Sequence, residues 1–463
     1  MRRAAFLALL LLGACALDKP PARDDALRQS LPNLKAPAAW AEKGGMDGPI
    51  GNDWLAAFND PRLEALVREA LAYNVDLQAA AGRVERAAAS VKSAGATLYP
   101  QVSLLARGGG AMSGDSSGLE GVGVFANWEL DVWGRVRAGR AAASGQYDSA
   151  SLDAEFARQS LAALVAKSWF LATEARLQKA VADEMAAAAA RNLAFAEDRR
   201  RIGSGDEYDV TLARASLATY RDAARNLEQA YRQSLRALEA LAGRYPAAAL
   251  EVPAELAALP GPVPVGMPSA LLERRPDVLA AERRLASAFY GTEQAKAARW
   301  PTISLTAAVT TVSSDLFVLK DRDNPVWSAG ASLLAPLFLG GQLQAQIDAR
   351  TADQKVALAE YGRVGARAFG EVESALSAGF ALEEREAILR EAAADNARAL
   401  ELANVRYRVG SGDLRAVQQQ TLALSAARAA LLRVQAERLV QRVNLHLALG
   451  GSFEAQASAE QKK

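Results

Sequence analysis

The side chains that do chemistry in most enzymes are scarce in this chain. Its 463 residues include one histidine, His446, and one cysteine, Cys15. These numbers exclude an intramolecular disulfide and leave too few ligands for most metal clusters and too few bases for most hydrolase triads. We therefore expect no catalytic residue, no metal and no cofactor. His446 lies beside Leu445 and Leu447 in a helical pattern, so an enzyme is the weakest functional alternative.

Charge and composition further restrict the possible function and fold of the protein. Lys and Arg number 54 and Asp and Glu number 53, so the net charge is +1. Such a balance leaves no field that would hold a polyanion, and we expect no nucleic-acid partner. Hydrophobic residues make up 51% of the chain but aromatic residues only 6%, because Ala, Leu and Val dominate. This composition is typical of long packed helices.

Cys15 follows a short secretion signal. A basic pair, Arg2-Arg3, precedes the apolar run Ala4–Leu12, which is too short for a membrane-spanning helix of roughly 20 residues. Leu12-Gly13-Ala14-Cys15 resembles the bacterial lipobox, which implies that Cys15 is acylated and becomes the mature N-terminus. An ordinary secretory signal with an uninvolved thiol is the alternative. Because Ala16 rather than Asp follows the cysteine, the resemblance points to the outer membrane.

The chain contains two copies of one large unit. Three segments of the first half recur in the second, and two of the pairs share an offset of about 201 residues. Chance similarity would not maintain one offset, so we expect two equivalent repeats. The pairs are Asp76–Ala80 with Asp277–Ala281, Tyr99–Leu104 with Trp300–Leu305, and Ile202–Asp206 with Val409–Asp413.

Each repeat carries two segments in which apolar and polar residues alternate. They follow Pro100 and Pro301, and the second of each pair covers 121–132 and 327–339. Runs of about ten alternating residues match a tilted membrane strand, whereas a soluble hairpin on a core is the alternative. Four strands leave unpaired edges, which hydrocarbon does not tolerate. Several copies must therefore share one barrel.

The helical segments have two lengths. From about Val136 to Ile202, and from about Gln342 to Val409, uninterrupted patterns predict helices of roughly 100 Å. A coiled-coil seam is expected along Leu161, Leu164 and Leu171. In each repeat, two shorter helices placed end to end about equal the long one. They are predicted over Arg62–Thr97 and Asp206–Gly243, and over Ser269–Ala298 and Asp413–Leu449.

Each long helix ends at a Gly-Ser-Gly-Asp segment. Glycine can take the left-handed conformation that stops a helix, and aspartate can cap the next one. We therefore expect two helix-turn-helix tips, where a partner docks; helix termination alone is the alternative. Asp209, near Asp206 and Asp413, is a candidate for a negative pore constriction, or an exposed first-turn residue favoured by the helix dipole. The tip residues are Gly203, Ser204, Gly205, Gly410, Ser411 and Gly412.

These features together resemble a known family. The motifs are Arg274–Asp277, Trp128–Arg135, Pro336–Gly341 and the two tips, in a chain with a lipobox. They resemble the outer-membrane efflux channels of the TolC/OprM type, particularly their lipoprotein (NodT-like) branch, over roughly Trp54 to Gly450. The fold class expected is mainly α with a β-barrel segment.

The resemblance implies an assembly and partners. Three chains would complete a twelve-stranded barrel in the outer membrane, continued by a coiled-coil α-barrel across the periplasm. The tips would meet a periplasmic adaptor joined to an inner-membrane pump, with proton-driven drug efflux as the first choice. The family's acidic ring just beyond the second tip is not reproduced, because Ala416 and Gln419 stand there. A type I protein-secretion duct and a non-conducting scaffold lipoprotein remain alternatives.

The resemblance also gives a division of the chain. A belt is expected from Lys19–Asn52, Tyr245–Pro268 and the residues after Gly450. The divisions are 1–14 (lipoprotein signal peptide), 15–53 (acylated segment and linker), 54–250 (first repeat), 251–268 (Pro-rich linker), 269–450 (second repeat) and 451–463 (flexible tail).

Overall fold

A computed structural model describes most of the chain. The described residues are 17–34, 37–42, 45–46, 48–107, 120–313 and 326–454; the signal peptide and Cys15 lie outside them. Two compact units divide the chain, and each takes residues from both sequence repeats. The first unit consists of the described residues within 17–34, 80–154 and 277–366. The second unit consists of the described residues within 37–79, 155–276 and 367–454.

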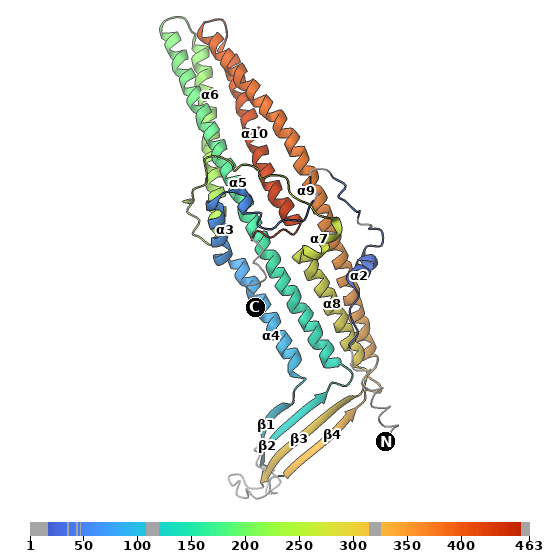
Figure 1. The fold of residues 1–463 in the computed structure, drawn as a ribbon. Helices are drawn as coiled ribbons and strands as arrows, with labels where there is room; N and C mark the ends of the chain where they lie inside the picture. Colours follow the sequence, from blue (N-terminus) through green and yellow to red (C-terminus); the bar gives the residue numbers. More distant parts are fainter. Residues whose placement is uncertain are drawn as a thin grey trace. The chain divides into compact units, whose positions relative to one another are not determined.

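The first unit contains a four-stranded antiparallel sheet in the order β1-β2-β3-β4 (Figure 1). The strands are β1 (Gln101–Arg107), β2 (Glu120–Leu130), β3 (Thr302–Ser313) and β4 (Val326–Leu334). The predicted alternation is thus confirmed in both repeats. The prediction was wrong at the end of β4, which stops at Leu334 instead of continuing to Leu339. Pro336 lacks the N–H that a further ladder bond requires.

The long helices have the expected lengths. Helices α5 (Arg135–Arg201) and α9 (Gln342–Arg408) each contain 67 residues, about 100 Å at 1.5 Å per residue. Each is followed by a helix of 35 residues, α6 (Glu207–Leu241) and α10 (Leu414–Ala448). The order of long helix, tip and shorter helix therefore recurs in both repeats.

Two of the shorter predicted helices are broken in the structure. Arg62–Thr97 is divided into α3 (Pro61–Tyr73) and α4 (Val75–Ala96), and Ser269–Ala298 into α7 (Pro268–Arg274) and α8 (Pro276–Ala297). Asn74 and Arg275 at the breaks have extended backbones. Pro276 disfavours the helical conformation at Arg275, while the Asn74 side chain accepts bonds from the Asp76 and Leu77 amides at 3.0 and 3.3 Å.

The two breaks make equivalent contacts, which supports the duplication. Asn74 donates its side-chain amide to the Leu241 carbonyl at 3.1 Å. Arg275 donates its guanidinium to the Ala448 carbonyl at 3.1 Å, at the matching end of α10. Arg275 is 2% exposed and also pairs with Glu371 at 2.6 Å. Each repeat thus uses a polar side chain to join a helix break to the end of the last helix.

The second unit has an apolar core around Trp169 and Phe170 of α5. The Trp169 indole donates to the Asp60 carboxylate at 2.8 Å. Glu239 of α6 accepts the amides of residues 248–250 at 2.6–2.9 Å. Burial alone would raise the pKa of Glu239, but these three bonds and Arg244 lower it. The buried carboxylate therefore holds the chain where it leaves α6.

The N-terminal segment of the expected belt contacts both of the other segments. Met46 pairs with Pro264 in a parallel bridge, and the Ser452 amide donates to the Asn52 side-chain oxygen at 3.2 Å. Phe453 is buried in the core of the second unit, so the first residues of the expected flexible tail are packed. Residues 455–463 lie outside the described part.

The N-terminal segment also contains a helix that the sequence patterns did not indicate. Helix α2 (Arg23–Ser30) lies in the first unit, where Arg23 pairs with Glu282 of α8 at 2.8 Å. A Cβ at Gly362 of α9 would lie 2.8 Å from the Ser30 Cβ. Glycine at this position therefore permits the close approach of α2 to α9.

Candidate functional site

The register of the sheet collects its apolar side chains on one face. Leu104, Val124, Val309 and Trp327 are consecutive partners across all four strands. Partners in adjacent strands point to the same side, so these four form one apolar row. Leu104 is 70% exposed, Val124 46% and Trp327 76%. An apolar row this exposed is not the inner face of a hairpin packed on a soluble core.

The opposite face is polar or small at most positions. Ser103 and Ser328 lie at the two ends of a row that also contains Phe125 and Ala308. Another row joins Gln101, Asn127, Thr306 and Gly330. A sheet with one exposed apolar face and one polar face matches a membrane strand pattern, in which lipid-facing and lumen-facing residues alternate.

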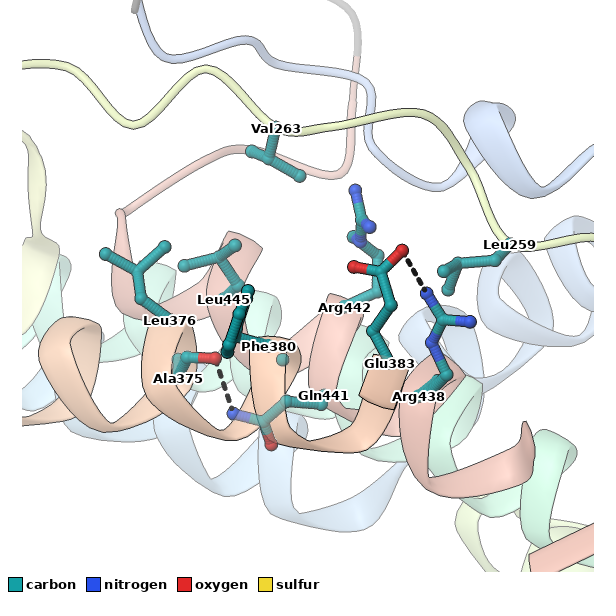
Figure 2. A pocket seen from close by; sticks show the side chains of 11 residues that line it. Leu259, Val263, Ala375, Leu376, Phe380, Glu383, Arg438, Gln441, Arg442 and Leu445 are labelled. Atoms are coloured by element: carbon teal, nitrogen blue, oxygen red, sulfur yellow. Dashed lines mark hydrogen bonds and ion pairs between the residues drawn. The ribbon is translucent and has the colours of Figure 1, made fainter. Parts of the chain in front are cut away.

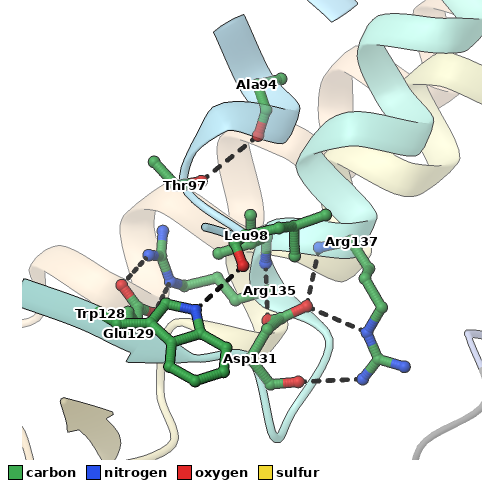
Figure 3. Close-up of polar contacts among 9 residues, drawn as sticks. Ala94, Thr97, Leu98, Trp128, Glu129, Asp131, Arg135 and Arg137 are labelled. Carbon is green, nitrogen blue, oxygen red and sulfur yellow. Dashed lines mark hydrogen bonds and ion pairs between the residues drawn. The ribbon is translucent and has the colours of Figure 1, made fainter. Parts of the chain in front are cut away.

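Polar contacts fix the junction between β2 and α5 (Figure 3). Asp131 accepts the amides of Val136 and Arg137 at 2.8 and 2.9 Å and so caps the first turn of α5. Arg135 makes a two-pronged bond to Glu129. The Trp128 indole donates to the Leu98 carbonyl at 2.9 Å. The sheet is therefore joined to the helix by a fixed turn.

Two tryptophans lie at the same junction. Trp133 and Trp300 stack with ring centroids 5.3 Å apart, and Trp133 donates to the Pro301 carbonyl at 2.8 Å. Trp133 is 38% exposed and Trp300 is 55% exposed. Exposed tryptophans that flank an apolar band are typical of a membrane interface.

The two tips have the geometry that their sequences predict. Gly203 and Gly410 both have a φ of +77°, the left-handed conformation that ends a helix. Asp206 caps α6 by accepting the Asp209 amide, and Asp413 caps α10 by accepting the Ala416 amide, both at 2.8 Å. Helix capping alone therefore accounts for Asp206 and Asp413, without a role in a pore.

An apolar cluster joins the two tips of the chain. Its buried members are Ala196, Val210, Ala213, Tyr407, Leu414 and Val417. Phe195 lies edge-on to Tyr407, with ring centroids 5.4 Å apart. Since these residues come from α5, α6, α9 and α10, both hairpins share one core at the tips.

Two arginine–tyrosine contacts cross between the hairpins, and we call them the tip clamps. The Arg199 guanidinium lies 5.2 Å from the Tyr407 ring centroid, and that of Arg415 lies 5.0 Å from the Tyr208 ring centroid. Each clamp pairs a residue of one repeat with a residue of the other. The sequence patterns did not predict them, because spacing within one repeat gives no information about contacts between repeats.

Asp209 is half-buried beside these clamps. Burial and the neighbouring Asp206 and Asp413 carboxylates raise its pKa, against the attraction of Arg199 and Arg415. The structure thus brings together all three predicted carboxylates near one another within a single chain. Three carboxylates and two guanidinium groups form a compact charged cluster at the tips.

His446 lies in α10 and is 8% exposed. It stacks on Trp54 with ring centroids 6.0 Å apart, and neither ring nitrogen has a hydrogen-bond partner among the described residues. Burial and the adjacent Arg442 lower its pKa from 6.5 to about 4. The single histidine is therefore neutral and packed at neutral pH.

This burial predicts an acid-sensitive stability. Since the folded-state pKa of His446 is lowered, its contribution is complete above about pH 6.5 and is lost as pH falls towards 4, by up to about 3 kcal/mol. We expect His446→Phe to flatten the fall in the unfolding midpoint over this pH range, measured by thermal unfolding. A pH profile that still falls as steeply as that of the unmodified protein would contradict the assignment.

The described residues contain neither a membrane-spanning helix nor a metal-binding cluster. None of the helices in this part of the chain is both long and apolar enough to cross a membrane. Within the same residues, no cluster of three or more His, Cys, Asp or Glu side chains has the arrangement of a metal site.

Comparison with known proteins identifies the family. The family model "Outer membrane efflux protein" matches residues 66–244 and 267–451. The chain is 31% identical to the pyoverdine export outer membrane protein OpmQ of Pseudomonas aeruginosa, over 97% of this chain and 96% of that protein. It is 29% identical to the cation efflux system protein CusC of Escherichia coli, over 87% and 88% of the two chains.

Solved structures agree with this assignment. The outer-membrane channel OprN superposes with a TM-score of 0.81 at 26% identity, over 91% of this chain and 99% of the other. The CmeC channel of Campylobacter jejuni gives a TM-score of 0.85 at 21% identity over 96% of each chain, which shows the shared fold. With its exposed apolar sheet face, duplicated long helices and nearly full-length match, the chain belongs to the outer membrane efflux protein family, whose members are channels and not enzymes.

Proposed function

We propose that three copies of this chain form the outer-membrane exit duct of a tripartite efflux system. The observation that carries the proposal is the apolar row across all four strands, which is exposed in a single chain. If β1 of one copy pairs with β4 of the next, the barrel closes and the backbone N–H and C=O groups of both edge strands are hydrogen-bonded. Purified protein should carry ion current across a planar bilayer. A protein that inserts without conducting would favour a scaffold instead.

The proposal also covers the cargo of the duct and the partners that supply cargo and energy. The related proteins are named for export of pyoverdine and for efflux of cations, and neither cargo is a protein. This favours a small-molecule duct over a type I secretion duct. We propose a periplasmic adaptor and a proton-driven inner-membrane pump as partners.

The lipid anchor belongs to the same proposal. A Cβ at Gly134 would lie 3.1 Å from the Leu17 side chain, so the start of the described chain lies at the β2–α5 junction. Cys15 precedes Leu17 by two residues, and acyl chains on it would anchor the chain in the membrane. Mass measurement of the mature N-terminal peptide tests this; an unmodified Cys15 thiol would overturn it.

The tips are the proposed docking surface for the adaptor. Proline cannot take a φ of +77°, so Gly203→Pro and Gly410→Pro should distort both turns and reduce adaptor cross-linking at least tenfold while trimers remain. Asparagine tolerates this conformation, and open space surrounds both positions, so Gly203→Asn and Gly410→Asn are matched controls. Undiminished cross-linking of the proline variants would argue against docking at the tips.

Asp209 is the proposed pore-lining carboxylate. Asp209→Ala should lower the preference for cations over anions several-fold, measured as reversal potential across a salt gradient in planar bilayers. The pKa of Asp209 is raised above that of an ordinary aspartate. On acidification, the unmodified channel should therefore begin to lose its preference for cations at a higher pH than a channel lined by an ordinary aspartate would. An unchanged reversal potential would remove Asp209 from the pore.

A further inference from the structure

A small pocket lies near the middle of α9, between α9, α10 and the chain at 259–263 (Figure 2). Its volume is about 80 Å³, which exceeds a single water site but holds only the end of a ligand. Leu376, Leu445 and Val263 form a buried apolar wall, and the half-exposed Phe380 also lines the pocket. We call it the belt pocket.

The polar side of the belt pocket has an excess of positive charge. Arg438 bonds to the buried Glu386, and Glu383 is 3.6 Å away from it. The Arg442 guanidinium bonds only to the Gly261 carbonyl, and no carboxylate of the described residues lies within ion-pair distance of it. Partly buried charges are normally paired, but Arg442 has only the longer-range attraction of Glu383 and no direct ion pair among the described residues.

The pKa of Arg442 is consistent with the lack of a direct ion pair. Burial and repulsion by Arg438 lower the pKa of Arg442, and Glu383 alone opposes them. A bound carboxylate would relieve this repulsion and accept the free guanidinium N–H groups. The Gln441 side chain already donates to the Ala375 carbonyl at 3.3 Å and accepts from Asn444 at 3.1 Å, which leaves Arg442 as the hydrogen-bond donor to an anion.

We propose that the belt pocket binds the carboxylate end of a short peptide whose last side chain is a methyl group, as in the alanine-terminated stem peptides of the cell wall. The apolar wall fits a methyl group, the volume excludes a long side chain, and Arg442 fits the carboxylate. The choice of source rests on the proposed function, because an outer-membrane duct that extends into the periplasm passes through the cell wall.

The experiment measures binding to the full-length detergent-purified protein. The probe is a fluorescent peptide ending in D-alanyl-D-alanine, compared with its C-terminal amide, and sedimentation with purified cell-wall sacculi is measured in parallel. We expect the acid to bind at least tenfold tighter than the amide, and Arg442→Gln to remove this difference. Glu383→Gln should tighten binding several-fold, because it removes the competing carboxylate; a merely structural role for the cluster predicts no gain.

The controls separate this proposal from the function of the duct. Arg385→Gln, on α9 near Glu383 but outside the pocket, should bind as the unmodified protein does. Conductance should be unchanged in all three variants, whereas failure of the duct proposal would appear as loss of current in the unmodified protein. Equal binding of acid and amide, no sedimentation with sacculi, or full binding by Arg442→Gln would each overturn the belt-pocket assignment.

Discussion

Val124→Arg should sharply reduce the amount of assembled protein in the membrane. Val124 lies near the middle of β2, in the apolar row that also contains Leu104 and Val309. An arginine on the lipid face at the bilayer midplane costs about 2–4 kcal/mol per chain, roughly a 30- to 1000-fold shift in the folding equilibrium. The folded fraction after insertion into lipid vesicles, read from resistance to protease, measures this effect.

Asn127→Arg is the matched control on the other face of the same strand. Asn127 pairs with Gln101 and Thr306 in a polar row, so an arginine there would point into water in the proposed barrel. Its folded fraction should stay close to that of the unmodified protein, while its ion selectivity shifts towards anions. Equal losses for both variants would mean that the apolar row does not face lipid.

Removal of both tip clamps should open the channel. In Arg199→Ala/Arg415→Ala, each chain loses two cation–π contacts worth roughly 0.5–1 kcal/mol apiece. Over three chains the loss is about 3–6 kcal/mol, which shifts a closed–open equilibrium by a factor on the order of 100 to 10,000. The open probability in planar bilayer recordings should rise accordingly, because, among the described residues, only the apolar cluster would still join the two tips.

Arg201→Ala/Arg408→Ala removes the same number of charges from the same tips. Arg201 is largely exposed and, among the described residues, pairs only with Asp198, one turn earlier in α5. Surface pairs of this kind contribute little, so recordings should resemble those of the unmodified channel. If both double variants raise the open probability equally, net charge rather than the clamps holds the tips.

Local signals in the sequence were sufficient for much of this fold. The helix stops at Gly203 and Gly410, the caps at Asp206 and Asp413, and the alternation in β2 all depend on neighbouring residues. Duplication then gave a second, independent observation of each element. The strand ends and helix breaks were less predictable, because they depend on single residues such as Pro336 and Asn74.

Contacts between distant segments were not predictable from these patterns. The expected seam through Leu161, Leu164 and Leu171 is only partly buried, since Leu164 is 44% exposed and Leu171 is 45% exposed. Trp169 and Phe170 form the core instead. An alanine-rich helix offers several apolar stripes, so its sequence does not select one of them. The tip clamps and the contacts of Arg442 were unpredictable for the same reason, because in each case the partner residues come from another element.

The central claim is that each chain supplies one third of a closed barrel, so that its two edge strands pair with sister copies. A cysteine at Ser103 of β1, combined in turn with one at Ser328 or Ser332 of β4, tests it by disulfide cross-linking in outer membranes. All three positions lie on the polar face of the sheet. We expect covalent dimers and closed trimers for at least one pair, and no cross-link in any of the three single variants. Cross-linked monomers, with β1 and β4 joined inside one chain, would contradict it.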